Sequence, residues 1–201
     1  MFYINSIFPT SIVGGSLDRE LTKEELAVAA EHKTKTYNNS GNITSLDRYI
    51  LKTQLPEIKK FIEEGIKTYV DEIIAPLNPL EFYITQSWLN YTELGQYHHK
   101  HAHPNSIISG VFYFNADEEK DKIFFYNEKY KQIAIPSKNW TIHNSESWWL
   151  PVKTGGLILF PSHLTHMVEQ TISTETRISL AFNVFAKGYI GDEVSLTALH
   201  L

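Results

Sequence analysis

The stretch that decides the fold reads Gln96-Tyr-His-His-Lys-His-Ala-His-Pro-Asn-Ser-Ile-Ile-Ser-Gly-Val-Phe-Tyr-Phe-Asn115. Four of the nine histidines in the chain fall within it, and an apolar, β-branched run follows them at once. Residues two apart in a β-strand point to the same side. We therefore expect His99, His101 and His103 to project from one face of an extended segment. Imidazoles grouped in this way predict one half of a metal site.

Composition limits the fold and the classes of partner. With 201 residues, 42% of them hydrophobic, the chain can bury a full core, and its net charge of -5 argues against a nucleic-acid binder. It contains no cysteine, so any metal must be held by nitrogen and oxygen ligands. No apolar run reaches the roughly 18 residues of a membrane span, and the N-terminus lacks the features of a signal peptide. We expect a cytoplasmic protein (in the host cytoplasm if the source is viral) with neither membrane nor nucleic acid as partner.

The first 78 residues predict a strand and helices. We expect a strand over residues 2–13, a turn at Gly14-Gly15 and a polar loop over residues 33–45. Thr22 and Glu25 match a capping box, which predicts a short helix to about His32. The clearest helix follows Pro56, because apolar residues recur at spacings of three and four: Ile58, Phe61, Ile62, Ile66, Tyr69, Val70 and Ile73.

From Phe82 onward the apolar pattern changes to a period of two. Short runs with strand character follow at intervals of roughly eight to twelve residues, which is typical of a sandwich or barrel. These runs are Ile107–Phe114, Ile123–Tyr126, Gln132–Ile135, Trp140–His143, Trp148–Val152, Leu157–Phe160 and Arg177–Phe185. We expect one domain over residues 1–201, in which residues 1–78 supply an opening strand and buttressing helices and residues 79–201 form a β-rich core with the metal site.

Two later segments supply candidates for the other half of the site. A Gly155-Gly156 turn leads into a buried strand that ends at Pro161, and His163 and His166 follow it. A further strand begins at Arg177 and places Arg177 and Ser179 on one face. A charged residue at the start of a core-facing strand is costly to bury unless it is paired. A guanidinium is suited to binding a carboxylate through two parallel hydrogen bonds.

These motifs together resemble those of the 2-oxoglutarate- and iron(II)-dependent dioxygenases, and most closely a subgroup of bacterial and phage oxygenases. The similarity covers roughly residues 80–186 and rests on four motifs in the same order. They are His101-Ala-His-Pro104, Ser109-Gly-Val-Phe-Tyr113, Phe160-Pro-Ser-His-Leu-Thr-His166 and Arg177-Ile-Ser-Leu-Ala-Phe-Asn183. The resemblance implies a mainly β fold with N-terminal helices: a double-stranded β-helix, or cupin-like jelly roll, with the metal at its open end.

The resemblance also implies roles for individual residues. The metal ligands would be His101, His103 and His166. Arg177 would bind the far carboxylate of 2-oxoglutarate, and Ser179 and Tyr113 would add donors. His163 would then be a pocket residue. The implied activity is hydroxylation of a small-molecule or protein side-chain substrate, with iron(II) and 2-oxoglutarate as cofactors, ascorbate as a reductant, and release of succinate and carbon dioxide.

Position 103 departs from the family pattern, which usually has Asp or Glu there. A third histidine in place of a carboxylate removes one negative charge from the metal site. This change favours binding of the dianion 2-oxoglutarate but weakens electron donation from the metal to oxygen. A ligand pair of His99 and His101 would also keep the strand alternation, although the spacing to Tyr113 favours His101 and His103. Because histidine must be deprotonated to bind a metal, metal affinity is expected to fall below about pH 6.5.

Other interpretations of the same residues stay open. His-x-His with a distal histidine also suits a cupin-type dioxygenase without 2-oxoglutarate, or a zinc hydrolase. The motif Arg177-x-Ser179 distinguishes a 2-oxoglutarate-dependent enzyme from these alternatives, because a co-substrate carboxylate needs the motif and a zinc site does not. A non-enzymatic β-sandwich would leave the histidine cluster without a role. The substrate, the native metal and the oligomeric state, including a homodimer, are not fixed by the sequence. Residues that could line the open end are His98, His99, Trp140, His143, Trp148 and Trp149.

Overall fold

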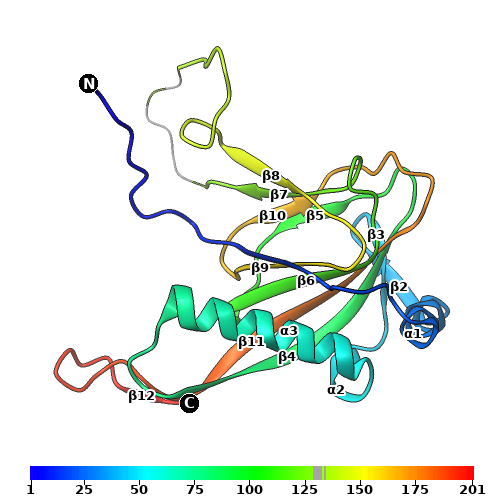
Figure 1. The fold of residues 1–201 in the computed structure, drawn as a ribbon, viewed down its shortest axis with the longest axis horizontal. Coiled ribbons are helices and arrows are strands. Elements are labelled where there is room, and N and C mark those ends of the chain that lie inside the picture. Colours follow the sequence, from blue (N-terminus) through cyan, green and yellow to red (C-terminus); the bar gives the residue numbers. More distant parts are fainter. Residues whose placement is uncertain (129–132, 134) are drawn as a thin grey trace.

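Three layers make up the fold in the computed structural model, which describes residues 1–128, 133 and 135–201 (Figure 1). Helix α3 (Pro56–Tyr69) lies across one face of a larger antiparallel sheet, and a smaller antiparallel sheet lies against the other face. Two sheets facing each other with one open end form the double-stranded β-helix that the resemblance implies, so the predicted fold class is confirmed.

The larger sheet has eight strands within the described part of the chain. Its order is β1 (Val13–Ser16), β9 (Gly156–Pro161), β6 (Ile108–Asn115), β11 (Arg177–Ile190), β4 (Leu80–Thr92), β3 (Asn42–Ser45) and β2 (Thr36–Asn39), and β12 (Leu199–His200) pairs with the end of β11. The smaller sheet has the order β5 (His98–His101), β10 (His166–Val168), β7 (Lys122–Tyr126) and β8 (Ser147–Pro151). Strands from the first 78 residues therefore belong to the same sheet as the later strands.

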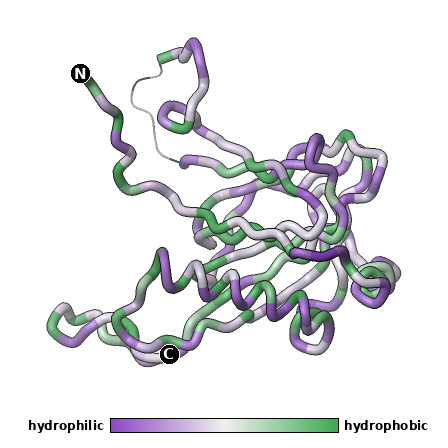
Figure 2. The backbone as a smooth tube through the Cα atoms, viewed as in Figure 1, coloured by the Kyte–Doolittle hydropathy of each residue, from purple (hydrophilic) through white to green (hydrophobic). Residues whose placement is uncertain are grey.

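The core between α3 and the larger sheet follows from the amphipathic pattern of the helix. Pro56 occupies the first helical position, where its missing N–H is not needed. The side chains of Ile58, Ile62, Ile66 and Tyr69 are buried against the sheet, and hydrophobic and hydrophilic residues alternate along the helix in Figure 2. Burying each isoleucine stabilises the fold by roughly 1.5–3 kcal/mol. The helix is scaffold, as its sequence predicts.

A second core lies between the two sheets and supports the site. Tyr113 and Phe160 of the larger sheet pack there with Ile123 and Phe125 of the smaller sheet. The rings of Phe125 and Phe160 meet edge to face, with their centroids 5.2 Å apart. Alternation along β6 explains the division, because Phe112 and Phe114 face the helix and Tyr113 between them faces the second core.

The predicted helix after Thr22 is confirmed as α1 (Lys23–Lys33). The N–H of Glu25 donates to the Thr22 hydroxyl at 3.2 Å, and the Thr22 N–H donates to the Glu25 carboxylate at 2.8 Å. Helix α2 (Ile50–Thr53) precedes α3, and one π-helical turn, η1 (Val70–Ile74), follows it. Within the described residues, none of the helices combines the length and apolar character needed to cross a membrane.

Three predictions of local structure are wrong. The opening strand is β1, which contains Gly14 and Gly15, whereas residues 2–12 form no strand. Residues 33–45 are not a loop, because β2 and β3 form a hairpin whose turn has Gly41 at φ 113°. Pairing of β3 with β4 buries Asn42, Thr44 and Ser45 and overrides their polar character.

The third wrong prediction is the strand Trp140–His143, where the chain forms a turn. The Asn144 side chain accepts a hydrogen bond from the Thr141 N–H at 2.8 Å, and this local bond competes with strand pairing. The predicted strand Gln132–Ile135 includes residues outside the described part of the chain.

Candidate metal centre

Two short strands of the smaller sheet bring the predicted ligands together. In the pairing of β5 with β10, His101 lies directly opposite His166. Their ring centroids are 4.3 Å apart, and the ring of His103 lies 4.9 Å from His101 and 5.1 Å from His166. One ligand atom from each of the three rings lies within 4.8 Å of the others. Two nitrogens on one ion lie at most about 4.2 Å apart, since each bond is about 2.1 Å. Small ring rotations therefore suffice for a shared ion.

His103 reaches this cluster by a different route from the one its spacing predicts. Strand β5 ends at His101, so His103 does not continue the strand alternation. Its backbone N–H instead donates to the Ser162 carbonyl at 2.9 Å, which fixes the segment beside the end of β9. His99 is not grouped with His166: within the described residues the other histidine group consists of His98, His99 and His101.

Hydrogen bonds to backbone carbonyls fix the orientation of two of the rings. Nδ1 of His101 lies 2.8 Å from the His99 carbonyl oxygen, and Nδ1 of His166 lies 3.0 Å from the Leu164 carbonyl oxygen. A carbonyl can only accept, so Nδ1 carries the proton in both rings. Nε2 is then the unprotonated nitrogen and has its lone pair available for a metal.

Burial keeps the cluster neutral. Burial and, to a lesser extent, the neighbouring imidazoles lower the pKa of His166 to about 3 and that of His103 to about 4. Burial also lowers the pKa of His101, although the hydrogen bond to the His99 carbonyl opposes the change. Neutral imidazole is the form that binds a metal. These shifts move the expected loss of metal affinity from about pH 6.5, the value expected from the sequence, towards pH 4.

The predicted co-substrate residues lie on the larger sheet, facing the second core. Arg177 is 3% exposed, and its guanidinium donates to the Lys122 carbonyl oxygen at 3.0 Å and to the Tyr113 hydroxyl at 3.4 Å. Ser179 pairs with Tyr113 across the sheet, so its side chain lies on the same face. Among the described residues, no carboxylate forms an ion pair with Arg177. The buried carboxylate of Asp121 lines a small cavity together with Arg177, but it accepts from the Asp117 N–H and forms no direct ion pair with the guanidinium. A buried guanidinium without a direct ion pair fits a site for an anionic ligand.

Tyr113 remains a neutral phenol in this environment. Burial raises the pKa of its hydroxyl, and the adjacent Arg177 opposes the change. A phenol that accepts from the guanidinium still has its own O–H to donate to a ligand. Burial, the neighbouring histidines and, to the smallest extent, the charge of Arg177 lower the pKa of His98.

Strand β4 contributes residues that sequence reasoning did not assign to the site. The Trp88 ring lies 6.1 Å from the His103 ring, and Thr92 pairs with Arg177. Asn90 lies between them and pairs with Ser179. The period of two in the sequence places these three residues on one face, but only the pairing of β4 with β11 shows that this face belongs to the site.

The other candidates for the open end differ in position. Trp148 continues a cross-strand row from His101 and His166 through Phe125, and it is 44% exposed at the edge of the smaller sheet. Trp149 faces the opposite way and lies under the Lys122 ammonium, 4.0 Å from its ring centroid. Of the remaining candidates, His98 lies near the amides of Asn39 and Asn42, whereas Trp140, His143 and His163 are exposed.

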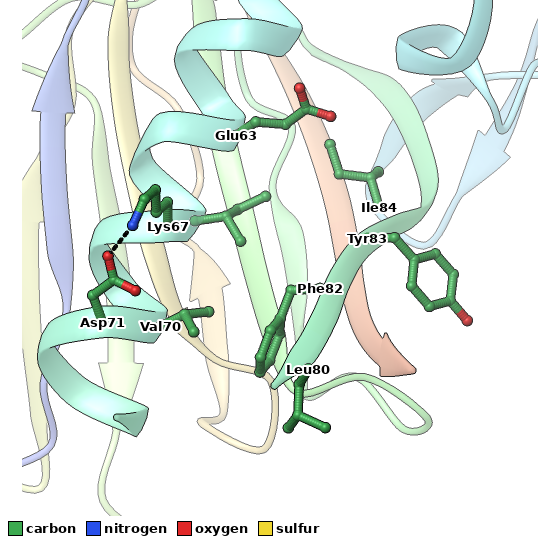
Figure 3. Close-up of a pocket in the computed structure, with 9 residues that line it drawn as sticks. Glu63, Lys67, Val70, Asp71, Leu80, Phe82, Tyr83 and Ile84 are labelled. Atoms are coloured by element: carbon green, nitrogen blue, oxygen red, sulfur yellow. Dashed lines mark hydrogen bonds and ion pairs between the residues drawn. The ribbon is translucent and has the colours of Figure 1, made fainter. Parts of the chain in front are cut away.

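A surface cavity of about 300 Å³ lies elsewhere, between α3 and the start of β4 (Figure 3). The apolar side chains of Val70, Leu80 and Phe82 line it, and the ion pair of Lys67 with Asp71 borders it. It contains none of the predicted site residues. It lies on the helix side of the larger sheet, away from the histidines.

The segment of the chain that holds this site matches a known family. Residues 86–183 match the model of the family described as "Putative 2OG-Fe(II) oxygenase". The matched segment begins in β4, ends in β11 and includes the three clustered histidines and Arg177. No curated protein matches the chain.

Solved structures with the same fold come from several enzymes. The non-heme alpha ketoglutarate dependent epimerase SnoN from nogalamycin biosynthesis has a TM-score of 0.62 at 11% identity, covering 88% of this chain and 76% of that one. A prolyl hydroxylase from Trichoplax adhaerens, in complex with a hypoxia inducible factor peptide fragment, has a TM-score of 0.59 at 13% identity (87% and 82% covered). HygX from Streptomyces hygroscopicus, with nickel and 2-oxoglutarate bound, has a TM-score of 0.54 at 8% identity (87% and 82% covered). At these identities the similarity shows a shared fold.

Proposed function

We propose, from the premise that residues 86–183 belong to a family of 2OG-Fe(II) oxygenases, that this chain hydroxylates a small molecule or a peptide side chain. Its cofactors are iron(II) and 2-oxoglutarate. When bound, they would supply the oxidative decarboxylation of 2-oxoglutarate by dioxygen, which places one oxygen atom in succinate, releases carbon dioxide and leaves the other oxygen atom for hydroxylation of the substrate. The solved structures of the same fold include an epimerase and a prolyl hydroxylase with a peptide, which is consistent with either class of substrate.

We infer that His101, His103 and His166 hold the metal through neutral nitrogens. The backbone hydrogen bonds of His101 and His166 support this assignment, because they leave Nε2 of each ring unprotonated and available to a metal. Both groups of described residues that could hold an ion consist of histidines alone. The bound metal would keep its full double positive charge, which favours a dianionic co-substrate over a neutral one.

The observation that carries the proposal is the buried guanidinium of Arg177, which forms no ion pair with a carboxylate of the described residues. A site that only held a structural zinc ion would gain nothing from it, and leaving such a charge without a counter-ion is costly. A 2-oxoglutarate carboxylate would supply the counter-ion and accept two parallel hydrogen bonds. Tyr113 and Ser179 would donate to the same carboxylate from the neighbouring strands.

The rest of the chain positions these groups and excludes water. The Phe160 ring packs 4.6 Å from the His166 ring, so one wall of the cluster is aromatic. Charges interact more strongly in such a water-poor site than at the surface. The hydrogen bond from Arg177 to the Lys122 carbonyl fixes the guanidinium before the co-substrate arrives.

Binding of 2-oxoglutarate to the protein loaded with manganese(II) tests this proposal. Arg177→Met keeps most of the side-chain stem and removes the charge. We expect its affinity for 2-oxoglutarate to fall at least about 30-fold, since truncating one partner of a buried charge pair costs about 2 kcal/mol or more. Arg19→Met is the control, because the Arg19 guanidinium pairs with Glu25 at the start of α1, outside the site. Equal affinity in Arg177→Met and wild type, with both proteins folded and manganese bound, would rule out the proposal.

A further inference from the structure

The side-chain amide of Asn90 lacks hydrogen-bond partners in the interior of the protein. Asn90 is 4% exposed, and its Oδ1 is buried without a partner. Its Nδ2 has no hydrogen bond to any part of the chain that the structure describes and, unlike Oδ1, is not among the fully buried side-chain atoms. The neighbouring hydroxyl of Thr44 cannot donate to it, because it already donates to the Leu89 carbonyl at 3.0 Å. Most buried polar side chains in folded proteins are paired, so an unpaired one calls for a ligand or a functional reason.

The position of Asn90 indicates which ligand would pair with it. Side chains on one face of β4 run from Trp88, whose ring lies 6.1 Å from that of His103, to Thr92, which pairs with Arg177. Asn90 lies midway on the same face, about 7 Å along the strand from each. Across the sheet it pairs with Ser179, which in turn pairs with Tyr113. The unpaired amide therefore lies between the metal end and the carboxylate end of the proposed co-substrate site.

We propose that Asn90 binds 2-oxoglutarate by donating an N–H hydrogen bond to one of its oxygen atoms. The inference rests on the proposed function and adds a residue to the site. 2-Oxoglutarate at neutral pH offers acceptors and no donor, so the amide must present its NH₂ end. The NH₂ group has no hydrogen bond within the described part of the chain, so it can donate to the ligand without breaking one.

A structural role for Asn90 predicts different behaviour from a ligand role. A structural amide would be hydrogen-bonded in the protein, and replacing it with leucine would destabilise the fold. An unpaired buried amide already lacks its hydrogen bonds, so Asn90→Leu, which has a similar volume, should leave the melting temperature of the ligand-free protein unchanged or higher. The same variant should lose much of the further stabilisation that 2-oxoglutarate adds to the manganese-loaded protein.

Calorimetric titration of 2-oxoglutarate into manganese(II)-loaded protein at pH 8 tests the inference. We expect Asn90→Leu to bind 2-oxoglutarate about 10- to 100-fold more weakly, which corresponds to one hydrogen bond to a charged group, and to keep its manganese affinity. Asn90→Asp keeps the shape but replaces the donor with a negative charge, so it should bind more weakly still. Asn183→Leu is the control, because the Asn183 amide accepts from the Ser109 hydroxyl at 2.9 Å: it should lose stability and keep its affinity.

The outcomes separate this inference from the proposed function. If wild type with manganese does not bind 2-oxoglutarate, the proposed function fails and the inference fails with it. If wild type binds and Arg177→Met is weakened but Asn90→Leu is not, the inference alone is overturned. A lower melting temperature of ligand-free Asn90→Leu, or an equal loss of manganese affinity, would show that Asn90 acts through the fold or the metal, and would also overturn it.

Discussion

Replacing His103 with alanine should remove most of the stabilisation that a metal gives to this protein, whereas replacing His99 should preserve it. Of these two residues, only His103 has a ligand atom grouped with those of both His101 and His166. An ion present at 100 times its dissociation constant adds about 2.7 kcal/mol to the free energy of unfolding. In a protein of this size that raises the melting temperature by roughly 5–10 °C.

Loss of one of three ligands should weaken the metal at least about 100-fold, because changes to residues that only support a ligand already cost 10- to 100-fold. At the same metal concentration the remaining stabilisation is about 0.4 kcal/mol, or roughly 1–2 °C. Thermal unfolding with and without manganese(II) or zinc(II) measures both variants. His163→Ala serves as the control, since His163 is exposed and outside the cluster. A shift that persists in His103→Ala and disappears in His99→Ala would refute the assignment.

Three other predictions concern pH, fluorescence and packing. Burial lowers the pKa of His103 to about 4 and of His166 to about 3, so the unfolded state, with histidine pKa near 6.5, takes up protons first. The metal-free protein should therefore lose stability as the pH falls from 6.5 toward 4, and chemical denaturation that shows no such loss would contradict the burial of these rings. Manganese(II) binding should quench tryptophan fluorescence mainly through Trp88, near His103, so that Trp88→Phe loses most of the quenching while Trp149→Phe keeps it. Gly110→Ala should lower the free energy of unfolding by about 1–3 kcal/mol in denaturant titrations, because the added methyl group would overlap the Phe182 ring, and unchanged stability would show that the core can move.

The sequence predicts much of this fold because its strongest periodic signals coincide with tertiary packing. The apolar spacing after Pro56 gives α3, and the period of two along β6 and β11 gives strands whose two faces pack in different cores. The hairpin over Thr36–Ser45 could not be predicted in this way. Its residues are polar, and they become strands because β3 pairs with β4, a contact between distant segments.

The candidate site also contains residues that the sequence predicts and residues that only the tertiary structure shows. The histidines and Arg177 carry chemistry that is visible in the sequence, and their motifs occur in a recognisable order. Asn90 and Trp88 could not be assigned to the site from the sequence, since asparagine and tryptophan are ordinary strand residues. Only the strand register shows that they lie beside Ser179 and His103. His103 lies in the cluster, as the sequence predicts, but for a different reason. Its position depends on the hydrogen bond from its N–H to the Ser162 carbonyl and not on strand alternation.

Formation of succinate tests the central claim most directly. Purified protein is incubated with iron(II), ascorbate, 2-oxoglutarate and oxygen, and succinate is measured over time. We predict that wild type forms succinate, and that His166→Ala and Arg177→Ala form little or none, because the first would lose a proposed metal ligand and the second the proposed counter-ion for the co-substrate. Equal amounts of succinate from wild type and both variants would contradict the assignment of this site as the centre of a 2-oxoglutarate-dependent oxygenase.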